Sequence, residues 1–89
     1  MTFRQIFEAL TNYQQQLMRA LLLGKTVYAN WNGGQRNADQ WRLEHRGYTK
    51  FGPTNLHGIP LRLTVEGWAI MATIVEQEQN EDQNTHEVA

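Results

Sequence analysis

The residues best suited to recognising a ligand lie in one basic and aromatic stretch, residues 28–51, which holds five of the nine Phe, Trp and Tyr residues. Arginine binds phosphates and carboxylates in a bidentate manner, and aromatic rings stack on bases or fill a pocket of a partner protein. Trp31 and Trp41 are predicted to face a core, which leaves the other face for binding. The predicted binding residues are Tyr28, Asn30, Arg36, Arg42, Arg46, Tyr48, Lys50 and Phe51.

Other chemistries lack the residues they need. The chain has neither cysteine nor serine, so thiolate catalysis, disulfides and the commonest hydroxyl nucleophile are excluded. The three histidines, His45, His57 and His86, show no ligand spacing, and the glycines do not form a phosphate-binding motif. We therefore predict a protein that is not an enzyme, with no catalytic residues, no metal and no cofactor.

The charge is unevenly distributed although the net charge is only −1. Residues 19–62 hold seven Lys and Arg residues against two acidic ones, whereas residues 66–89 hold six acidic residues and no basic one. This pattern is typical of proteins that bind nucleic acids or acidic partners, although it also suits ordinary solubility. No segment is long and apolar enough to span a membrane and no signal peptide pattern follows Met1, so a cytoplasmic protein without a membrane partner is expected.

The first element is predicted to be one long helix, from about residue 2 to 23. Apolar residues from Phe3 to Leu21 recur in steps of three and four, and Gly24 is a suitable stop. The opposite face, with Gln14, is expected to be solvated. Thr11 and Gln14 also have the spacing of a capping box, so a second helix could begin there. Because the apolar phase continues through this point, a single helix is favoured.

Alternating residues predict strands over 25–31 and 40–48, joined by the eight residues from Asn32 to Asp39, which begin with the turn dipeptide Asn32-Gly33. A loop is expected over 47–58, followed by a third strand over 59–63 that Pro60 marks as an edge strand. Thr64 is a suitable N-cap and Glu66 suits a first turn, which predicts a helix over residues 65–76.

The C-terminal segment has two interpretations. Val65, Trp68, Ala72 and Val75 lie on one helical face, but the β-branched residues within 70–75 would also suit a buried strand. We favour the helix. The predicted fold is α+β: a long N-terminal helix, a three-stranded antiparallel sheet and a C-terminal helix in one domain over residues 1–76, with a disordered acidic tail over 77–89.

Two short resemblances to known families are present. Gln14 to Gly24, taken with Leu61 to Gly67, resembles the first helix and the strand-to-helix exit of winged-helix regulators, but a glycine-rich loop stands where a recognition helix belongs. Residues 23–27 and 31–33 resemble the opening of a small phage anti-defence family that sequesters cyclic nucleotide signals. A serine-free, amide-rich chain of this size also suggests a phage accessory protein. Neither resemblance is extensive enough to assign site residues.

Three hypotheses for function follow. The first is a non-catalytic regulator or inhibitor that binds a protein partner through the predicted residues. The second is a nucleic-acid-binding module that uses the same basic face, and the third is a protein that sequesters a nucleotide. The sequence also leaves room for a homodimer through the edge strand at Pro60 or through Met18 and Leu22.

Overall fold

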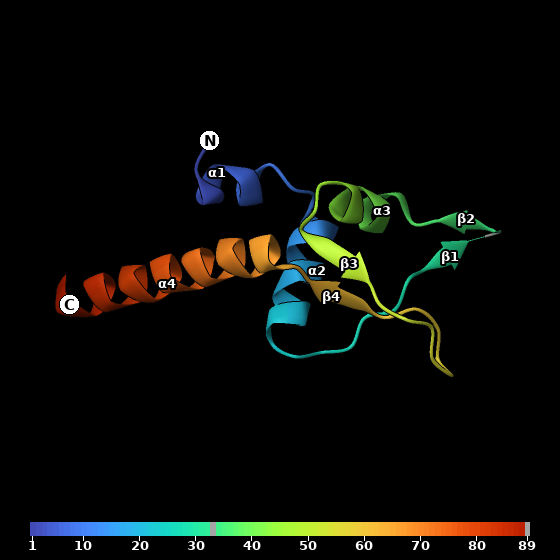
Figure 1. Ribbon diagram of the computed structural model, residues 1–89. Coiled ribbons are helices and arrows are strands. Elements are labelled where there is room, and N and C mark those ends of the chain that lie inside the picture. The colour runs from blue at the N-terminus through green and yellow to red at the C-terminus, as the bar shows by residue number, and fades with distance from the viewer. Residues whose placement is uncertain (33, 89) are drawn as a thin grey trace.

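The computed structural model describes residues 1–32 and 34–88, with side chains described for 1–30 and 34–81. Within these residues the chain is α+β, as expected, and its helices are separated by short antiparallel strands (Figure 1). The elements are, in order, α1 (Phe3–Glu8), α2 (Asn12–Leu22), β1 (Trp31–Asn32), β2 (Gln35–Arg36), α3 (Ala38–His45), β3 (Thr49–Phe51), β4 (Leu61–Leu63) and α4 (Val65–Val88).

The N-terminal helix is broken at Thr11, so the expectation of one long helix is wrong. The Thr11 hydroxyl accepts the backbone N–H of Gln14 (3.1 Å), and the Gln14 side chain accepts the N–H of Thr11 (3.0 Å). This capping box begins α2. The amide of Gln15 donates to the carbonyls of Phe7 and Leu10 (both 3.1 Å). Because the polar groups at the break have these partners, the apolar repeat can continue across two helices.

The segment expected to be a second strand, residues 40–48, instead forms most of α3. Asn37 is the N-cap, since its side chain accepts the backbone N–H of Gln40 (3.1 Å). Gln40 and Leu43 are three residues apart and both are buried, whereas Trp41 is 42% exposed. The expectation that Trp41 belongs to the core is therefore wrong. Over so few residues, an alternation of apolar and polar side chains fits one face of a helix as well as a strand. The N-cap at Asn37 favours the helix.

Strands β3 and β4 form an antiparallel hairpin in which Thr49 pairs with Leu63, and Lys50 with Arg62. This hairpin occupies part of the segment expected to be a loop, residues 47–58. The stretch expected as the first strand contributes one isolated bridge, between Tyr28 and Pro60, the residue before β4, and then continues into a separate hairpin of β1 and β2. The expected three-stranded sheet is not present as one continuous ladder.

Pro60 does not mark an edge, contrary to expectation. On one side the backbone of residues 27–29 bonds to its neighbours, through Leu61 N–H to the Val27 carbonyl (2.8 Å) and Ala29 N–H to the Ile59 carbonyl (2.7 Å). On the other side the Pro60 carbonyl accepts the N–H of Gly52 (2.7 Å). This position ends the β3–β4 ladder, so the proline forfeits only a terminal bond.

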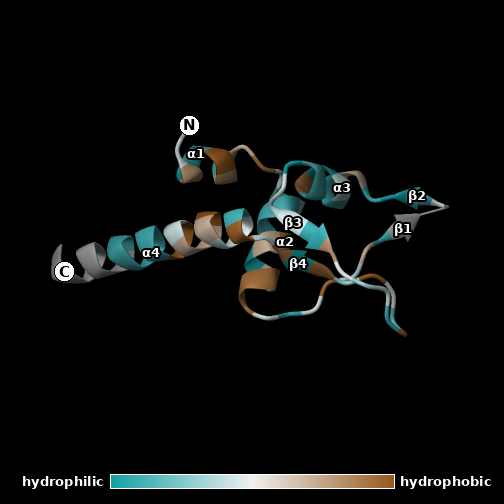
Figure 2. Cartoon of the chain, in the orientation of Figure 1, coloured by the Kyte–Doolittle hydropathy of each residue, from teal (hydrophilic) through white to brown (hydrophobic). Residues whose placement is uncertain are grey.

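The core lies where α1 and α2 pack against the first half of α4, with Leu43 of α3 and Leu61 of β4 added to it, and Figure 2 shows the apolar part of α4 beside α1. The predicted helix over 65–76 is confirmed, but its buried face is formed by Ile70, Met71 and Ile74. Met18 is also fully buried and is not available to a partner. The core residues are Phe7, Leu10, Leu17, Met18, Leu21, Leu43, Leu61, Ile70, Met71 and Ile74.

Helix α4 begins against the backbone of the segment that follows α3. Thr64 acts as N-cap, because its hydroxyl accepts the N–H of Gly67 (3.1 Å) while its own N–H donates to the Tyr48 carbonyl (3.1 Å). A Cβ atom on Gly67 would lie 2.1 Å from this same carbonyl oxygen. Only glycine fits at this contact.

Helix α4 continues to Val88, whereas a disordered tail was expected from residue 77, and its side chains are described as far as residue 81. Both guanidinium nitrogens of Arg19 donate to the Glu78 carboxylate (3.1 and 2.5 Å). Arg4 contacts Gln77 (3.4 Å) and Glu81 (3.8 Å). The segment therefore packs on α1 and α2 through polar contacts, which the low content of apolar residues does not indicate.

We expect Gly67→Ala to lower the free energy of unfolding by about 3 kcal/mol, because the added methyl group collides with a backbone oxygen. Thermal or urea unfolding measures the change. Gly34→Ala is the control, since a Cβ there meets open space and only its positive φ of 84° is unfavourable, for about 1 kcal/mol. Equal losses for the two variants would contradict the close contact.

A second prediction concerns acid. The hydrogen bond from Arg19 holds the pKa of Glu78 below its usual value. The ion pair therefore stabilises the fold above the unfolded-state pKa near 4.3 and its contribution is lost as pH falls further. Since both side chains are partly exposed, Glu78→Gln should destabilise the protein by about 0.2–1 kcal/mol at neutral pH and by less at about pH 3.

The matched control is Glu76→Gln, an exposed position two residues earlier on α4 with no ion pair to a described residue. Its urea unfolding curve should overlay the wild-type curve at both pH values. A difference between Glu78→Gln and wild type that is independent of pH would contradict the ionic origin of the effect.

Candidate functional site

The position of α3 is fixed by the buried amide of Gln40, which is 2% exposed. Its oxygen accepts the N–H of Asn30 (2.8 Å), and its nitrogen donates to the Tyr13 hydroxyl (3.0 Å) and the Tyr28 carbonyl (3.1 Å). These bonds join α3 to α2 and to the extended segment before β1. A fixed helix can present its outer face to a ligand in one orientation.

The outer face of α3 is basic and aromatic. Trp41, Arg42, His45 and Arg46 are all exposed. The rings of Trp41 and His45 stack, with centroids 5.2 Å apart and planes 12° apart. Sequence analysis had placed Arg42 and Arg46 on a strand, but both remain available at the surface.

The β3–β4 hairpin with its connecting turn forms a projecting arm, residues 49–63, directly after α3 (Figure 1). Lys50 and Arg62 are exposed and stand directly opposite each other in the ladder. Like charges at such a position destabilise a hairpin, so this pair is unfavourable unless an anion lies nearby. We call the exposed faces of α3 and the arm the helix–arm surface; its residues are Trp41, Arg42, His45, Arg46, Lys50 and Arg62.

The tip of the arm is a well-ordered turn. The backbones of Asn55 and Gly58 exchange two hydrogen bonds (2.8 and 3.2 Å), and the Asn55 side chain accepts the N–H of His57 (2.7 Å). Leu56 at this tip is 100% exposed. The turn gives the arm a fixed end beyond the ladder.

Arginine and lysine side chains differ in their ion pairing between the α4 end of the molecule and the helix–arm surface. At the α4 end, Arg4 and Arg19 form ion pairs with glutamates. On the helix–arm surface, Arg42, Arg46 and the Lys50–Arg62 pair form no ion pair with any carboxylate of the described residues. The arginines beside α4 are thus neutralised by ion pairs, whereas the cations of the helix–arm surface are not paired with a carboxylate of the described residues.

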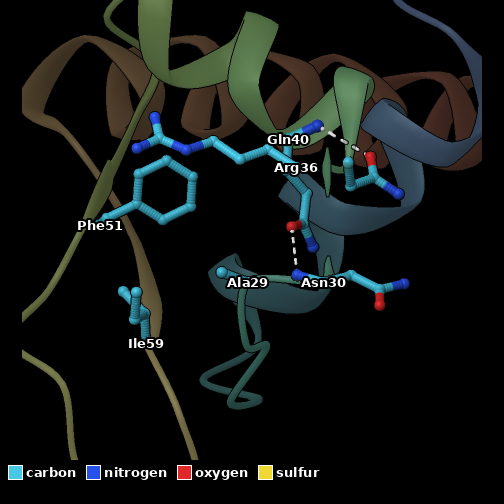
Figure 3. Close-up of a pocket in the computed structure, with 7 residues that line it drawn as sticks. Ala29, Asn30, Arg36, Gln40, Phe51 and Ile59 are labelled. Carbon is cyan, nitrogen blue, oxygen red and sulfur yellow. Dashed lines mark hydrogen bonds between the residues drawn. The ribbon is translucent and has the colours of Figure 1, made fainter. Parts of the chain in front are cut away.

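A cavity of about 150 Å³ lies between α3, the arm and the segment before β1 (Figure 3). It gathers three of the predicted binding residues, Asn30, Arg36 and Phe51, beside the apolar walls of Ala29 and Ile59. A cavity of this volume holds one small ring, as an engineered cavity of similar size holds benzene. It is therefore smaller than a nucleotide requires.

Tyr28 lies in a different and larger groove, of about 730 Å³, between the arm and the start of α4. Lys25, Arg62 and Trp68 also line it. Tyr48 is half-buried and its carbonyl anchors α4, which indicates a structural role. The predicted residues are thus distributed over the cavity, the groove and the helix–arm surface.

Sequence analysis missed three residues of the helix–arm surface: Trp41, His45 and Arg62. Arg62 could have been found, since it is the polar middle of Leu61-Arg62-Leu63 and must face away from the core. Trp41 was assigned to the core because of its size. The side chain of Trp31, the other expected core tryptophan, lies outside the described residues.

Within the described residues, no three histidine, cysteine or acidic side chains come together as metal ligands would. Among the same residues, no helix combines the length and apolar character that a membrane crossing requires. Comparison of the chain with protein-family models, curated proteins and solved structures finds no match in any of the three.

The role of Gln40 is testable. We expect Gln40→Met to lower the free energy of unfolding by about 2–4 kcal/mol, because the buried amide loses three hydrogen bonds while the side-chain volume is nearly kept. Gln35→Met, on the exposed strand β2, is the control and should change stability by less than about 0.5 kcal/mol. Chemical unfolding measures both, and a mild effect of Gln40→Met would show that α3 is held by other contacts.

Proposed function

We propose that this protein is a non-catalytic nucleic-acid-binding module that grips double-stranded DNA with the helix–arm surface. The observation that carries the proposal is the set of exposed cations without carboxylate partners, Arg42, Arg46, Lys50 and Arg62, on adjoining elements. Phosphates would relieve the repulsion between Lys50 and Arg62, since each cation could contact a separate oxygen.

The dimensions of the elements suit a duplex. Helix α3 has eight residues and is about 12 Å long, and an α-helix fits the major groove, which is about 12 Å wide. The arm follows α3 after a short connection, so it can follow the phosphate backbone while α3 lies in the groove. The exposed Trp41 and His45 on α3 are then positioned to face base edges, with Arg42 and Arg46 toward bases or phosphates.

The order of elements adds support. The resemblance to winged-helix regulators lacked a recognition helix between its two matching segments, and α3 occupies that interval, ahead of a two-stranded hairpin. In helix-turn-helix proteins the recognition helix is likewise held by an earlier helix, and here Gln40 links α3 to α2. This support concerns arrangement only and assigns no sequence preference.

The test is binding of a labelled mixed-sequence duplex of about 20 base pairs, followed by fluorescence anisotropy over salt concentrations from about 50 to 200 mM. With four phosphate contacts, we expect the logarithm of the association constant to fall against log salt with a slope of about −3.6. Lys50→Gln combined with Arg62→Gln should make this slope shallower by about 2.

Arg4→Gln is the control, because Arg4 is a cation on α1, away from α3 and the arm, and pairs with Glu8 and Glu81. It should leave the slope unchanged. Absence of duplex binding at low salt, or equal losses for Arg4→Gln and the arm variants, would overturn the proposal. In the first case the hypothesis of a regulator that acts on a protein partner becomes the better explanation for the same surface.

A further inference from the structure

Helix α4 has a second apolar stripe on the side away from its own core. Val65 is 87% exposed, Trp68 is 48% exposed, Ala72 is exposed and Val75 is half-buried. These residues follow one another in steps of three, four and three, the spacing of a coiled-coil seam. The sequence pattern indicated this stripe as one helical face, and the core is filled by Ile70, Met71 and Ile74 on another face.

We propose that the stripe is the interface of a homodimer, in which two α4 helices pack antiparallel and cross at Ala72. A two-fold interface requires a surface that is complementary to itself. Placing the two-fold axis at Ala72 sets Val65 level with Gln79 of the second copy, and Trp68 level with Glu76. Ala72 then faces itself, and a small residue at a crossing point lets two helices approach closely.

The charges select the antiparallel direction. Residues 65–75 of α4 contain one acidic residue, Glu66, whereas residues 76–88 contain five. A parallel pair would place the two acidic halves side by side, where they repel. The antiparallel pair lays each acidic half along the less charged half of the other copy, toward the positive N-terminal end of its helix and toward Lys25 in the groove beside Trp68.

The remaining contacts of α4 leave the stripe available. The helix is held to α1 and α2 by Arg4 and Arg19, which bind Glu81 and Glu78. Neither glutamate belongs to the stripe. Helix α4 is about 36 Å long, and the stripe lies on a different face of its first half from Ile70, Met71 and Ile74, so a second copy can pack on the stripe without displacing the core.

The first test is the molar mass of the full chain, measured by light scattering after size exclusion over a range of concentrations. The wild type should have the mass of a dimer, and Trp68→Gln should shift it toward the monomer. Trp41→Gln is the matched control, since Trp41 is exposed to a similar degree on α3, and it should remain dimeric. Circular dichroism reports whether each variant is folded. A wild type that is monomeric throughout would overturn the proposal.

The second test fixes the direction and uses the absence of natural cysteine. Under mild oxidation, Ala72→Cys should give a disulfide-linked dimer because the two copies meet at this position. Gln79→Cys alone should not, whereas Gln79→Cys combined with Val65→Cys should. Efficient cross-linking of Gln79→Cys alone would indicate a parallel pair, and absence of a link in Ala72→Cys would place the interface elsewhere; either result overturns the antiparallel dimer. Neither test requires DNA, so failure of the proposed function leaves this inference standing.

Discussion

The buried side-chain amide of Gln40 joins three segments of the chain at one point. Two further bonds support it: the Gln14 amide donates to the Asp39 carbonyl (3.2 Å), and the Asn37 N–H donates to the Asn30 carbonyl (2.9 Å). An apolar side chain in its place would pack, but it would not specify how α3 is rotated relative to α2 and to the strand before β1. The amide does specify it, because Asn30, Tyr28 and Tyr13 must all reach the same group. This rotation of α3 determines the direction in which its outer face points, and it also determines where the arm after α3 begins. A chain this small has a thin apolar core, so apolar packing alone has few contacts with which to position α3.

The distribution of carboxylates divides the molecule into two parts with different uses of arginine. On the α4 side, Arg4 and Arg19 form internal ion pairs that attach α4 to α1 and α2. On the helix–arm surface, cations stand next to each other without compensation, and one pair faces across a ladder. Internal pairing strengthens a fold modestly, whereas uncompensated cations weaken it slightly and attract anions. The antiparallel dimer proposed for α4 would occupy the first part, and DNA the second.

The fold could be predicted from the sequence where local interactions determine the secondary structure. It was predicted wrongly where contacts between distant segments determine it. The capping box at Thr11 indicated the start of α2. The continuous spacing of apolar residues argued for a single helix instead, but two successive helices can share that spacing. The expected strand over 40–48 is wrong because Asn37 caps a helix there. The alternation of apolar and polar residues over this stretch is too short to distinguish a strand from a helix. The helix from residue 65 was predicted correctly, but not its buried face, since Gly67 must meet a carbonyl and this contact rotates the helix. Of the candidate site, the exposed arginines were found, but the pairing of Lys50 with Arg62 depends on a strand register that no local pattern reveals.

The contact between α1 and α4 has a consequence for how the chain is made. These helices are the first and the last elements in sequence, and the apolar side chains at the end of α1 are buried only when α4 is present. During synthesis Phe7 and Leu10 therefore leave the ribosome long before their covering exists. At about 5–20 residues per second, that interval lasts several seconds. Packing of α1 against α4 must then wait until α4 has been made, and a nascent chain that is truncated before α4 leaves the apolar side chains of Phe7 and Leu10 without this cover.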